Sequence, residues 1–165
     1  MFILKEYRPR NNSQSKDKYF HLLTKDNSRF SFIEKNVYTI FGIEKFYNNT
    51  TFKWVINEEQ IKFLSDLENH ILNTIKEFDV ATFNDISLKN NNIIIKNNYP
   101  TMLNTFIKKK AHEIIEHDEG DILNNFSTIK KHQKYNVRVE INNLYVNLDK
   151  KELSYKYLVT KIMNP

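Results

Sequence analysis

The sequence predicts an α+β, mostly β fold, in which a small barrel of short strands surrounds one long amphipathic helix at about residues 58–78. Short aromatic-rich or alternating runs recur along the 165 residues and are separated by turn-forming residues. Helical three- and four-residue spacing of apolar side chains is sustained in one long segment. Many strands, one helix and no βαβ rhythm favour a barrel over a parallel sheet.

The N-terminal part is expected to begin with a strand and a hairpin. Phe2–Tyr7 alternates weakly between apolar and polar residues, and the polar linker RPRNNSQSKDK follows it. The aromatic-rich runs Tyr19–Leu23 and Arg29–Ile33 flank the turn-forming residues Lys25–Ser28. That pattern is typical of two antiparallel strands joined by a short turn.

The next strand and the helix have clear periodicity. Thr50–Ile56 alternates, so Phe52, Trp54 and Ile56 should share one face. Glu58 to Phe78 is predicted to be the helix, because its apolar residues mark one buried face and Asn57 can cap its start. The residues of that face are Ile61, Leu64, Leu67, Ile71, Leu72, Ile75 and Phe78.

The rest of the chain is expected to return to short strands. The predicted strands are Ile86–Leu88, Ile93–Lys96, Met102–Lys108, Tyr135–Ile141, Leu144–Leu148 and Leu153–Ile162. Residues His112–Leu123 are expected to form a short helix or a long acidic loop. Asn142 and Asn143 should turn the chain from one strand into the next, which makes the end of the chain a β-ribbon.

Composition limits the class of protein. A chain of 165 residues with 40% hydrophobic residues is expected to form one domain over residues 1–165. It has no cysteine, which fits a reducing compartment and excludes thiolate zinc sites and disulfides. No apolar run is long enough to span a bilayer, and the N-terminus lacks the pattern of a signal peptide, so we expect a protein that is neither membrane-bound nor secreted.

Motifs for catalysis and cofactors are missing from the sequence. Two glycines cannot assemble a dinucleotide fingerprint or a P-loop, and no GxSxG nucleophile motif occurs. The histidines of HEIIEH, His112 and His117, are five residues apart, whereas the zincin motif needs four to put both on one helix face. We therefore expect no enzyme activity, no metal and no cofactor.

Positive charge is concentrated near the end of the chain. Residues 122–165 carry eight Lys and Arg against three acidic residues, 8 − 3 = +5, which equals the net charge of the whole chain. A basic segment with interleaved tyrosines suits single-stranded nucleic acid, because cations bind phosphates and ring faces stack on any base. Alternatively, the charged runs are simply solvated surface. RNA is not excluded as the ligand, since nothing in these residues recognises the 2′-hydroxyl.

The same logic selects candidate contact residues, some with a structural alternative. Trp54, the only tryptophan, is a candidate for base stacking, although its alternation with Phe52 and Ile56 equally indicates a core position. The candidates for phosphate contacts are Lys53, Lys108, Lys110, Lys131, Lys134, Arg138 and Lys156. The candidates for base stacking are Trp54, Tyr99, Tyr145 and Tyr155.

Three blocks of the chain resemble the OB-fold single-stranded-DNA-binding proteins of large nucleocytoplasmic DNA viruses, which are distant relatives of phage-type proteins. The blocks are YTIFGIEKFYNNTTFKWVINEEQIKFLSDLENHI, KNNYPTMLNTFIKK and YNVRVEINNLYVNLDKKELSYKYLVTKI. Phe41-Gly42 and Tyr99-Pro100 match dipeptides of that family. Tyr145 and Tyr155 stand where the family tends to have tryptophan, and Glu152 replaces its glycine.

The resemblance implies a single OB-fold-like nucleic-acid-binding domain that coats single-stranded DNA during viral replication, recombination or repair. It would act in the cytoplasm or nucleus of the host cell, with replication proteins as further partners and homo-oligomers as an option. The alternative is a structural or protein-interaction module of a virion or replication complex, whose aromatic residues meet another protein.

Overall fold

The computed structural model consists of two compact units, and each has its own β-sheet. It describes residues 2–10, 15–47, 49–89, 92–107, 115–116, 122–123 and 128–165. Unit 1 comprises Met1–Phe30, Glu58–Asn90 and Ile141–Tyr155, and unit 2 comprises Ser31–Asn57, Asn91–Glu140 and Lys156–Pro165. That the whole chain behaves as a single domain stays a prediction.

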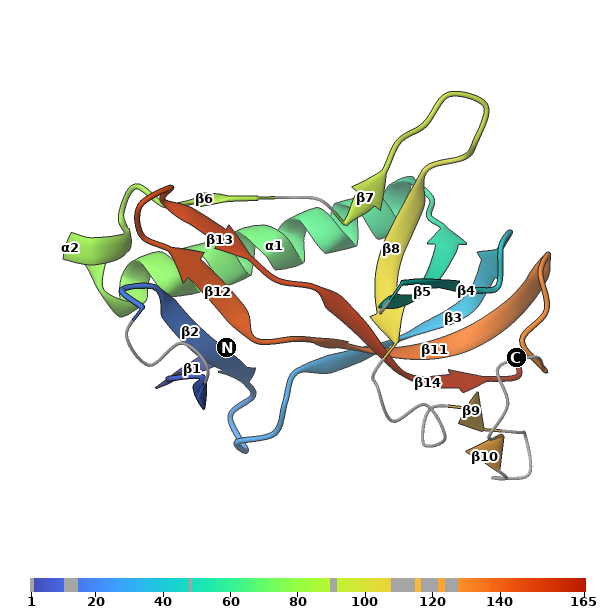
Figure 1. Cartoon of the computed structure of the whole chain (residues 1–165), viewed down its shortest axis with the longest axis horizontal. Coiled ribbons are helices and arrows are strands. Elements are labelled where there is room, and N and C mark those ends of the chain that lie inside the picture. The colour runs from blue at the N-terminus through green and yellow to red at the C-terminus, as the bar shows by residue number, and fades with distance from the viewer. Residues whose placement is uncertain are drawn as a thin grey trace. The chain divides into compact units, whose positions relative to one another are not determined.

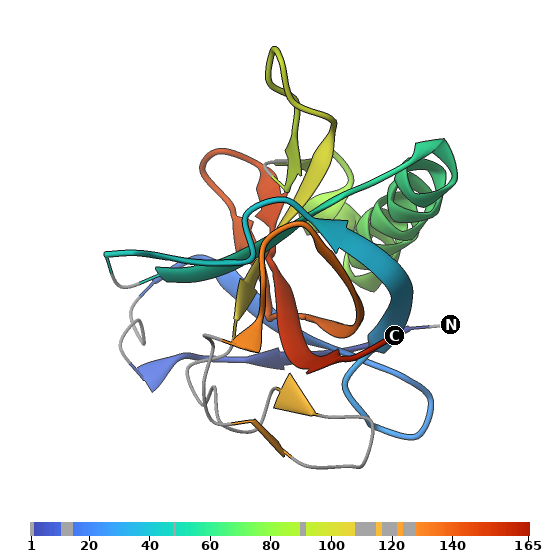
Figure 2. The same cartoon turned by 90° about the vertical axis from the view of Figure 1, so that its right-hand side faces the viewer.

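Unit 2 is a small closed β-barrel (Figure 1). Around the ring, the strands follow the order β3 (Ser31–Thr39), β5 (Asn49–Val55), β8 (Met102–Ile107), β14 (Tyr157–Met163) and β11 (Gln133–Ile141). The ring closes because β11 pairs with β3 and β14 also pairs with β8. Figure 2 shows the same strands turned by 90°. The expectation of a small, mostly β barrel is confirmed.

Shorter strands extend the barrel sheet beyond the ring. They are β4 (Ile43–Phe46), β7 (Ile93–Ile94), β9 (Ile115–Glu116) and β10 (Ile122–Leu123). The first pairs with β5 and forms a hairpin, β7 pairs with β8, and β9 pairs with β14. Within residues 112–123, the described positions are therefore strands, and the expected helix is wrong there; the other residues of that range lie outside the described part.

The barrel core follows from alternation along its strands. In β5, Phe52 and Trp54 are completely buried, while Lys53 between them is half-buried, as a period of two requires. Val137 and Val139 of β11 are buried in the same way. The Phe52 and Trp54 ring centroids lie 5.8 Å apart, so two large rings fill much of the interior.

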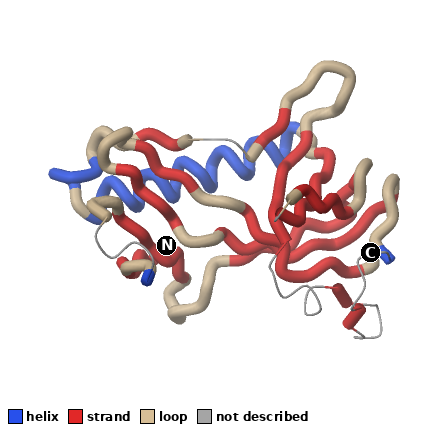
Figure 3. The backbone as a smooth tube through the Cα atoms, viewed as in Figure 1, coloured by secondary structure: helices blue, strands red, loops and turns tan. Residues whose placement is uncertain are grey.

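Unit 1 packs a five-stranded sheet against the long helix α1 (Glu58–Phe78), which Figure 3 shows in blue. The strand order is β1 (Ile3–Tyr7), β2 (Lys18–Leu23), β12 (Leu144–Asn147), β13 (Glu152–Ser154) and β6 (Ser87–Leu88). The Phe20 ring of β2 lies edge-on to two rings: its centroid is 5.0 Å from that of Phe78 and 5.9 Å from that of Phe83 in α2 (Val80–Phe83). The sheet therefore has one face buried against helices.

The helix agrees with the sequence prediction in its bounds and its buried face. Leu64, Leu67, Ile71 and Ile75 are buried, whereas Phe78, at the end, is 48% exposed. Among the described residues, no helix combines the length and the apolar character needed to span a bilayer.

One predicted hairpin forms only at its start, and a second is wrong in its pairing. Around the turn at Thr24–Ser28, Leu23 and Arg29 form an antiparallel bridge and Phe30 N–H donates to Leu22 O at 3.3 Å, but β2 and β3 then enter different sheets. Likewise, the strands on either side of Asn142-Asn143 belong to different sheets. The predicted strand Leu153–Ile162 is interrupted, since β13 ends at Ser154 and β14 starts at Tyr157.

Replacing Trp54 by alanine should lower the free energy of unfolding by about 3–5 kcal/mol, because a fully buried ring leaves a cavity in the barrel. Urea unfolding followed by circular dichroism measures this. Tyr47, which is 92% exposed, provides the control, and Tyr47→Ala should change stability by less than about 0.5 kcal/mol. A loss below about 1 kcal/mol for Trp54→Ala would contradict the core position.

Candidate nucleic-acid interface

A basic segment, Lys130–Lys134, leads from the buried Ile129 into the first residues of β11 in the barrel unit. Gly42 has a φ of +67°, and a β-carbon there would lie 3.5 Å from the carbonyl oxygen of Ile129, so the two backbones run close together. The buried Tyr135 hydroxyl accepts a hydrogen bond from Lys130 N–H at 2.8 Å. This hydrogen bond fixes the start of the segment, so its side chains project from an anchored backbone.

The basic segment lines a pocket of about 570 Å³. Tyr38 of β3 also lines it and is in register with Lys134 across the β3–β11 ladder. Its hydroxyl is 3.2 Å from His132 Nδ1, and His132 has a positive φ of 56°. This volume falls within the roughly 300–1,000 Å³ typical of ligand pockets.

The pocket is lined by cations without carboxylate partners in the described part of the chain. Lys130 and Lys134 both line it, both are exposed, and neither forms an ion pair with a described residue. His132 adds a third nitrogen-bearing side chain, and Asn164 offers an amide. A surface of this kind is electrostatically complementary to phosphate, and Tyr38 adds an aromatic ring.

Three of the predicted phosphate contacts fall in this region. Lys131 is exposed within the basic segment, Lys134 lines the pocket, and half-buried Arg138 lies farther along the outer face of β11. Among the described residues, no carboxylate pairs with the Arg138 guanidinium. The strand thus continues the positive charge of the pocket.

The other predicted lysines of the barrel are engaged elsewhere. Lys53 forms an ion pair with Glu44 of the β4–β5 hairpin, at 3.1 Å between Nζ and Oε1. Lys156 is exposed, and its Nζ lies 4.4 Å from the ring centroid of Phe106, a cation–π distance. Lys108 and Lys110 lie outside the described residues, as does most of HEIIEH.

Two predicted stacking residues are corrected by their burial. Trp54 is completely buried in the barrel, and Tyr155 is 6% exposed at the junction between β13 and β14. Neither ring can stack on a base without rearrangement of the fold, so the core alternative for Trp54 holds. Tyr99 is 50% exposed before β8, with its ring centroid 5.8 Å from that of Phe41, and stays a candidate.

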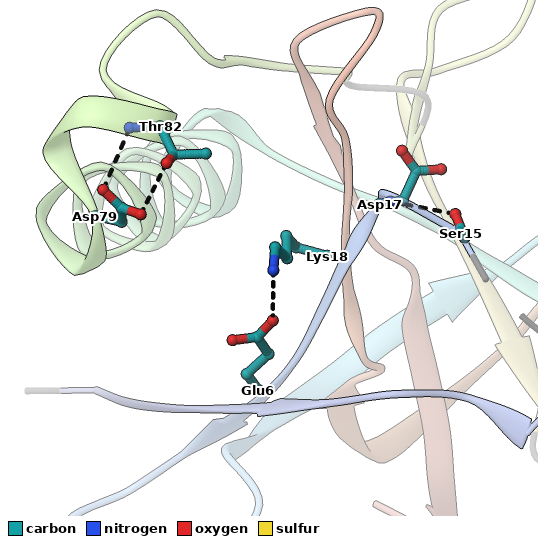
Figure 4. Close-up of polar contacts among 6 residues, drawn as sticks. All are labelled: Glu6, Ser15, Asp17, Lys18, Asp79 and Thr82. Atoms are coloured by element: carbon teal, nitrogen blue, oxygen red, sulfur yellow. Dashed lines mark hydrogen bonds and ion pairs between the residues drawn. The ribbon is translucent and has the colours of Figure 1, made fainter. Parts of the chain in front are cut away.

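Tyr145, the remaining predicted stacking residue, lies in unit 1. It is half-buried on β12, and its hydroxyl donates to Asp17 Oδ2 at 2.6 Å. The other oxygen of Asp17 accepts from Leu148 N–H at 3.2 Å, and its own N–H donates to Ser15 Oγ, as Figure 4 shows. The hydrogen bond to Asp17, assisted by burial, raises the pKa of Tyr145 to about 12.

Tyr38, Lys130 and His132 are pocket residues that were not among the sequence-derived candidates. Lys130 and His132 belong to the run KKHQK, whose charge was visible, but their convergence was not. Tyr38 could be assigned only from its register opposite Lys134, which depends on a strand nearly a hundred residues away. In the described part of the chain, no cluster of His, Cys, Asp or Glu could hold a metal ion.

The sequence matches no protein-family model and no curated protein. The chain is a small, mostly β protein whose barrel carries a basic pocket.

Replacement of Tyr145 by phenylalanine should remove a tyrosine that ionises near pH 12. Because Asp17 and burial favour the neutral phenol in the folded state, Tyr145 should lose its proton near pH 12, above the ordinary value of 10. The stabilisation linked to this proton is complete below pH 10 and is lost as the pH rises towards 12.

Phenolate absorbance followed against pH measures this in the folded protein. The Tyr145→Phe protein should lack the ionisation step near pH 12, and Tyr47→Phe, at an exposed site, is the control that should keep this step. An unchanged step near pH 12 in Tyr145→Phe would contradict the assignment.

Proposed function

We propose that this chain is a non-enzymatic, sequence-tolerant single-stranded-DNA-binding protein. The observation that carries the proposal is the pocket of Lys130, His132, Lys134 and Tyr38, which combines unpaired cations with an aromatic ring. The cations bind phosphates whatever the sequence, and an aromatic side chain accepts any unpaired base. A duplex hides its base faces, so it could use only the electrostatic part of such a surface.

The barrel topology supports an OB-fold as the finer description. In chain order the ring strands β3, β5, β8, β11 and β14 are first to fifth, and around the ring they run first, second, third, fifth, fourth. The third and fifth pair in parallel, with Leu158 opposite Phe106. A five-stranded Greek-key barrel that binds oligonucleotides is the description of an OB-fold.

The proposed role is to coat transient single strands during viral DNA replication, recombination or repair, in the cytoplasm or nucleus of the host cell. This role follows from the family resemblance of residues 38–162 and from the absence of catalytic motifs in the sequence. RNA with the same backbone charge is the natural competitor, and discrimination would require contacts to the 2′-hydroxyl.

The logarithm of the affinity for poly-dT should fall with the logarithm of the salt concentration, with a slope of about −3.5 if about five phosphates are neutralised. Replacing Lys130 and Lys134 together by alanine should remove two of these contacts and reduce the slope to about −2.1. Fluorescence anisotropy of labelled poly-dT at several salt concentrations measures both values.

The matched control replaces two exposed lysines of unit 1, Lys62 and Lys89, by alanine, which changes the net charge equally. This control should keep the wild-type slope. Equal losses in both double variants would mean that net charge, and not the pocket, sets affinity. Failure of the wild-type protein to bind, or equal binding of duplex, would refute the proposed function.

One observation favours a protein-interaction module as the second candidate. Phe46 and Tyr47, at the tip of the β4–β5 hairpin, are 69% and 92% exposed, and their ring centroids lie 4.6 Å apart. Exposed aromatic pairs are typical of interface anchors. If this hairpin joins two copies of the chain, sedimentation equilibrium should show a dimer that Phe46→Ser/Tyr47→Ser dissociates, whereas a monomeric wild-type protein would contradict self-association.

A further inference from the structure

The sheet of unit 1 carries a row of three tyrosines, here called the tyrosine face: Tyr7 of β1, Tyr19 of β2 and Tyr145 of β12. Tyr19 is in register with both of the others. Ring centroids are 5.9 Å apart for Tyr7 and Tyr19 and 5.2 Å apart for Tyr19 and Tyr145. The three side chains are half-buried, so the row crosses three neighbouring strands without being enclosed.

The tyrosine face is opposite the helix-packed face of the same sheet. Phe20 follows Tyr19 and is fully buried against Phe78 of α1, and successive side chains of a strand point to opposite faces. On β12, the fully buried residues Leu144 and Val146 flank Tyr145 in the same way. Core packing is therefore supplied by the other face and does not require a row of rings here.

Cationic side chains lie at the Tyr7 end of the row. The His21 ring stacks on Tyr7 at 4.1 Å with an interplanar angle of 5°, and His21 Nδ1 donates to Asn143 Oδ1 at 2.7 Å. Arg29 Nη1 donates to the same oxygen at 3.2 Å. Lys5, two residues before Tyr7 on β1, is exposed on the same side of the strand.

These cations are available for an anionic ligand. Arg29 is exposed, and neither it nor Lys5 pairs with a carboxylate among the described residues. Of the acids on this face, Asp17 is held by the Tyr145 hydroxyl and Leu148 N–H, and Glu152 is in register with Asn147, two residues beyond Tyr145 on β12 and at the far end of the row from Arg29 and Lys5. The Glu6–Lys18 ion pair, with 3.0 Å between Nζ and Oε1, belongs to the opposite side of the strands because Glu6 is in register with Phe20. Figure 4 shows this pair.

Cross-strand tyrosine pairs also stabilise sheets by themselves. That role accounts for the ring contacts but not for Arg29 and Lys5 beside them, which have no carboxylate partner among the described residues. It also leaves unexplained the hydrogen bonds that hold Tyr145 and His21 at the two ends of the row. Rings held in place next to cations that no carboxylate neutralises match the two requirements of single-strand binding, which are stacking and backbone neutralisation.

We propose that the tyrosine face is a second contact surface for single-stranded DNA, where unpaired bases stack on Tyr7, Tyr19 and Tyr145 and the cations Arg29 and Lys5 contact phosphates. This inference rests on the proposed function and extends it from the barrel pocket to the sheet of unit 1. The two surfaces divide the interaction: the pocket is mainly electrostatic, whereas the tyrosine face is mainly a stacking surface. Because stacking does not require counterion release, the two contributions respond differently to salt.

The test uses Tyr19, the centre of the row, in the full chain. Tyr19→Ala should weaken binding to labelled poly-dT by about fivefold or more, since stacking on one aromatic ring contributes about 1–3 kcal/mol, and it should leave the salt slope unchanged. Tyr19→Phe keeps the ring and should bind within about twofold of the wild-type protein. Thermal unfolding of each variant, followed by circular dichroism, identifies any loss of fold.

A second measurement does not depend on variant stability. Poly-dT containing 5-iodouracil, irradiated in complex with the wild-type protein and mapped by mass spectrometry, should crosslink to at least one peptide carrying Tyr7, Tyr19 or Tyr145. Crosslinks confined to peptides of unit 2, together with wild-type affinity of Tyr19→Ala, would overturn this inference.

The same titrations separate the two proposals. If Lys130→Ala/Lys134→Ala weakens binding while Tyr19→Ala does not, the proposed function stands and the tyrosine face is structural. If the wild-type protein does not bind poly-dT at low salt, both proposals fall. Both proposals are supported if Tyr19→Ala weakens binding to poly-dT without changing the salt slope and Tyr19→Phe binds like the wild-type protein.

Discussion

Closure of the barrel is the constraint on which the rest of unit 2 depends. The parallel pairing of β14 with β8, at Leu158–Phe106 and Val159–Ile107, joins the last ring strand to the third. Parallel neighbours need a long connection, and the segment between β8 and β14 is long enough to supply the fourth strand on the way. Closure protects the backbone groups of the ring strands and gives the alternating side chains a shared interior, filled largely by Phe52 and Trp54.

The same connectivity positions the two candidate surfaces. The chain enters β11 through the basic segment Lys130–Lys134, and the Tyr135 hydroxyl holds the start of that segment. Between β11 and β14 the chain contributes β12 and β13 to the sheet of unit 1, which brings Tyr145 opposite Tyr19. A segment of fewer than forty residues therefore supplies residues to both candidate surfaces, and it is the segment in which the sequence concentrates positive charge and tyrosines.

Local periodicity was sufficient to predict the elements but not their partners. The bounds of α1 and the inward face of β5 follow from spacing that is complete within one segment. The Lys25–Ser28 and Asn142-Asn143 turns had the chemistry of hairpins, yet their flanking strands pair with distant segments. A turn residue determines that the chain changes direction. The strand with which the next segment pairs is determined by non-local packing, which no short window of sequence contains.

For the site, the ligand class stays a prediction, whereas the structure decides the exposure of the individual candidate residues. Tyr155 and Trp54 had suitable rings, but burial removed both, because exposure depends on which face of a strand meets the core. Tyr19 and Tyr38 lay outside the basic segment and gained their positions through register with Tyr145 and Lys134. A stacking or phosphate-binding surface is assembled across strands, so its members share a row of the sheet and not a stretch of sequence. Charge density in the sequence therefore predicts where a polyanion would be attracted, whereas strand register decides which rings could reach its bases.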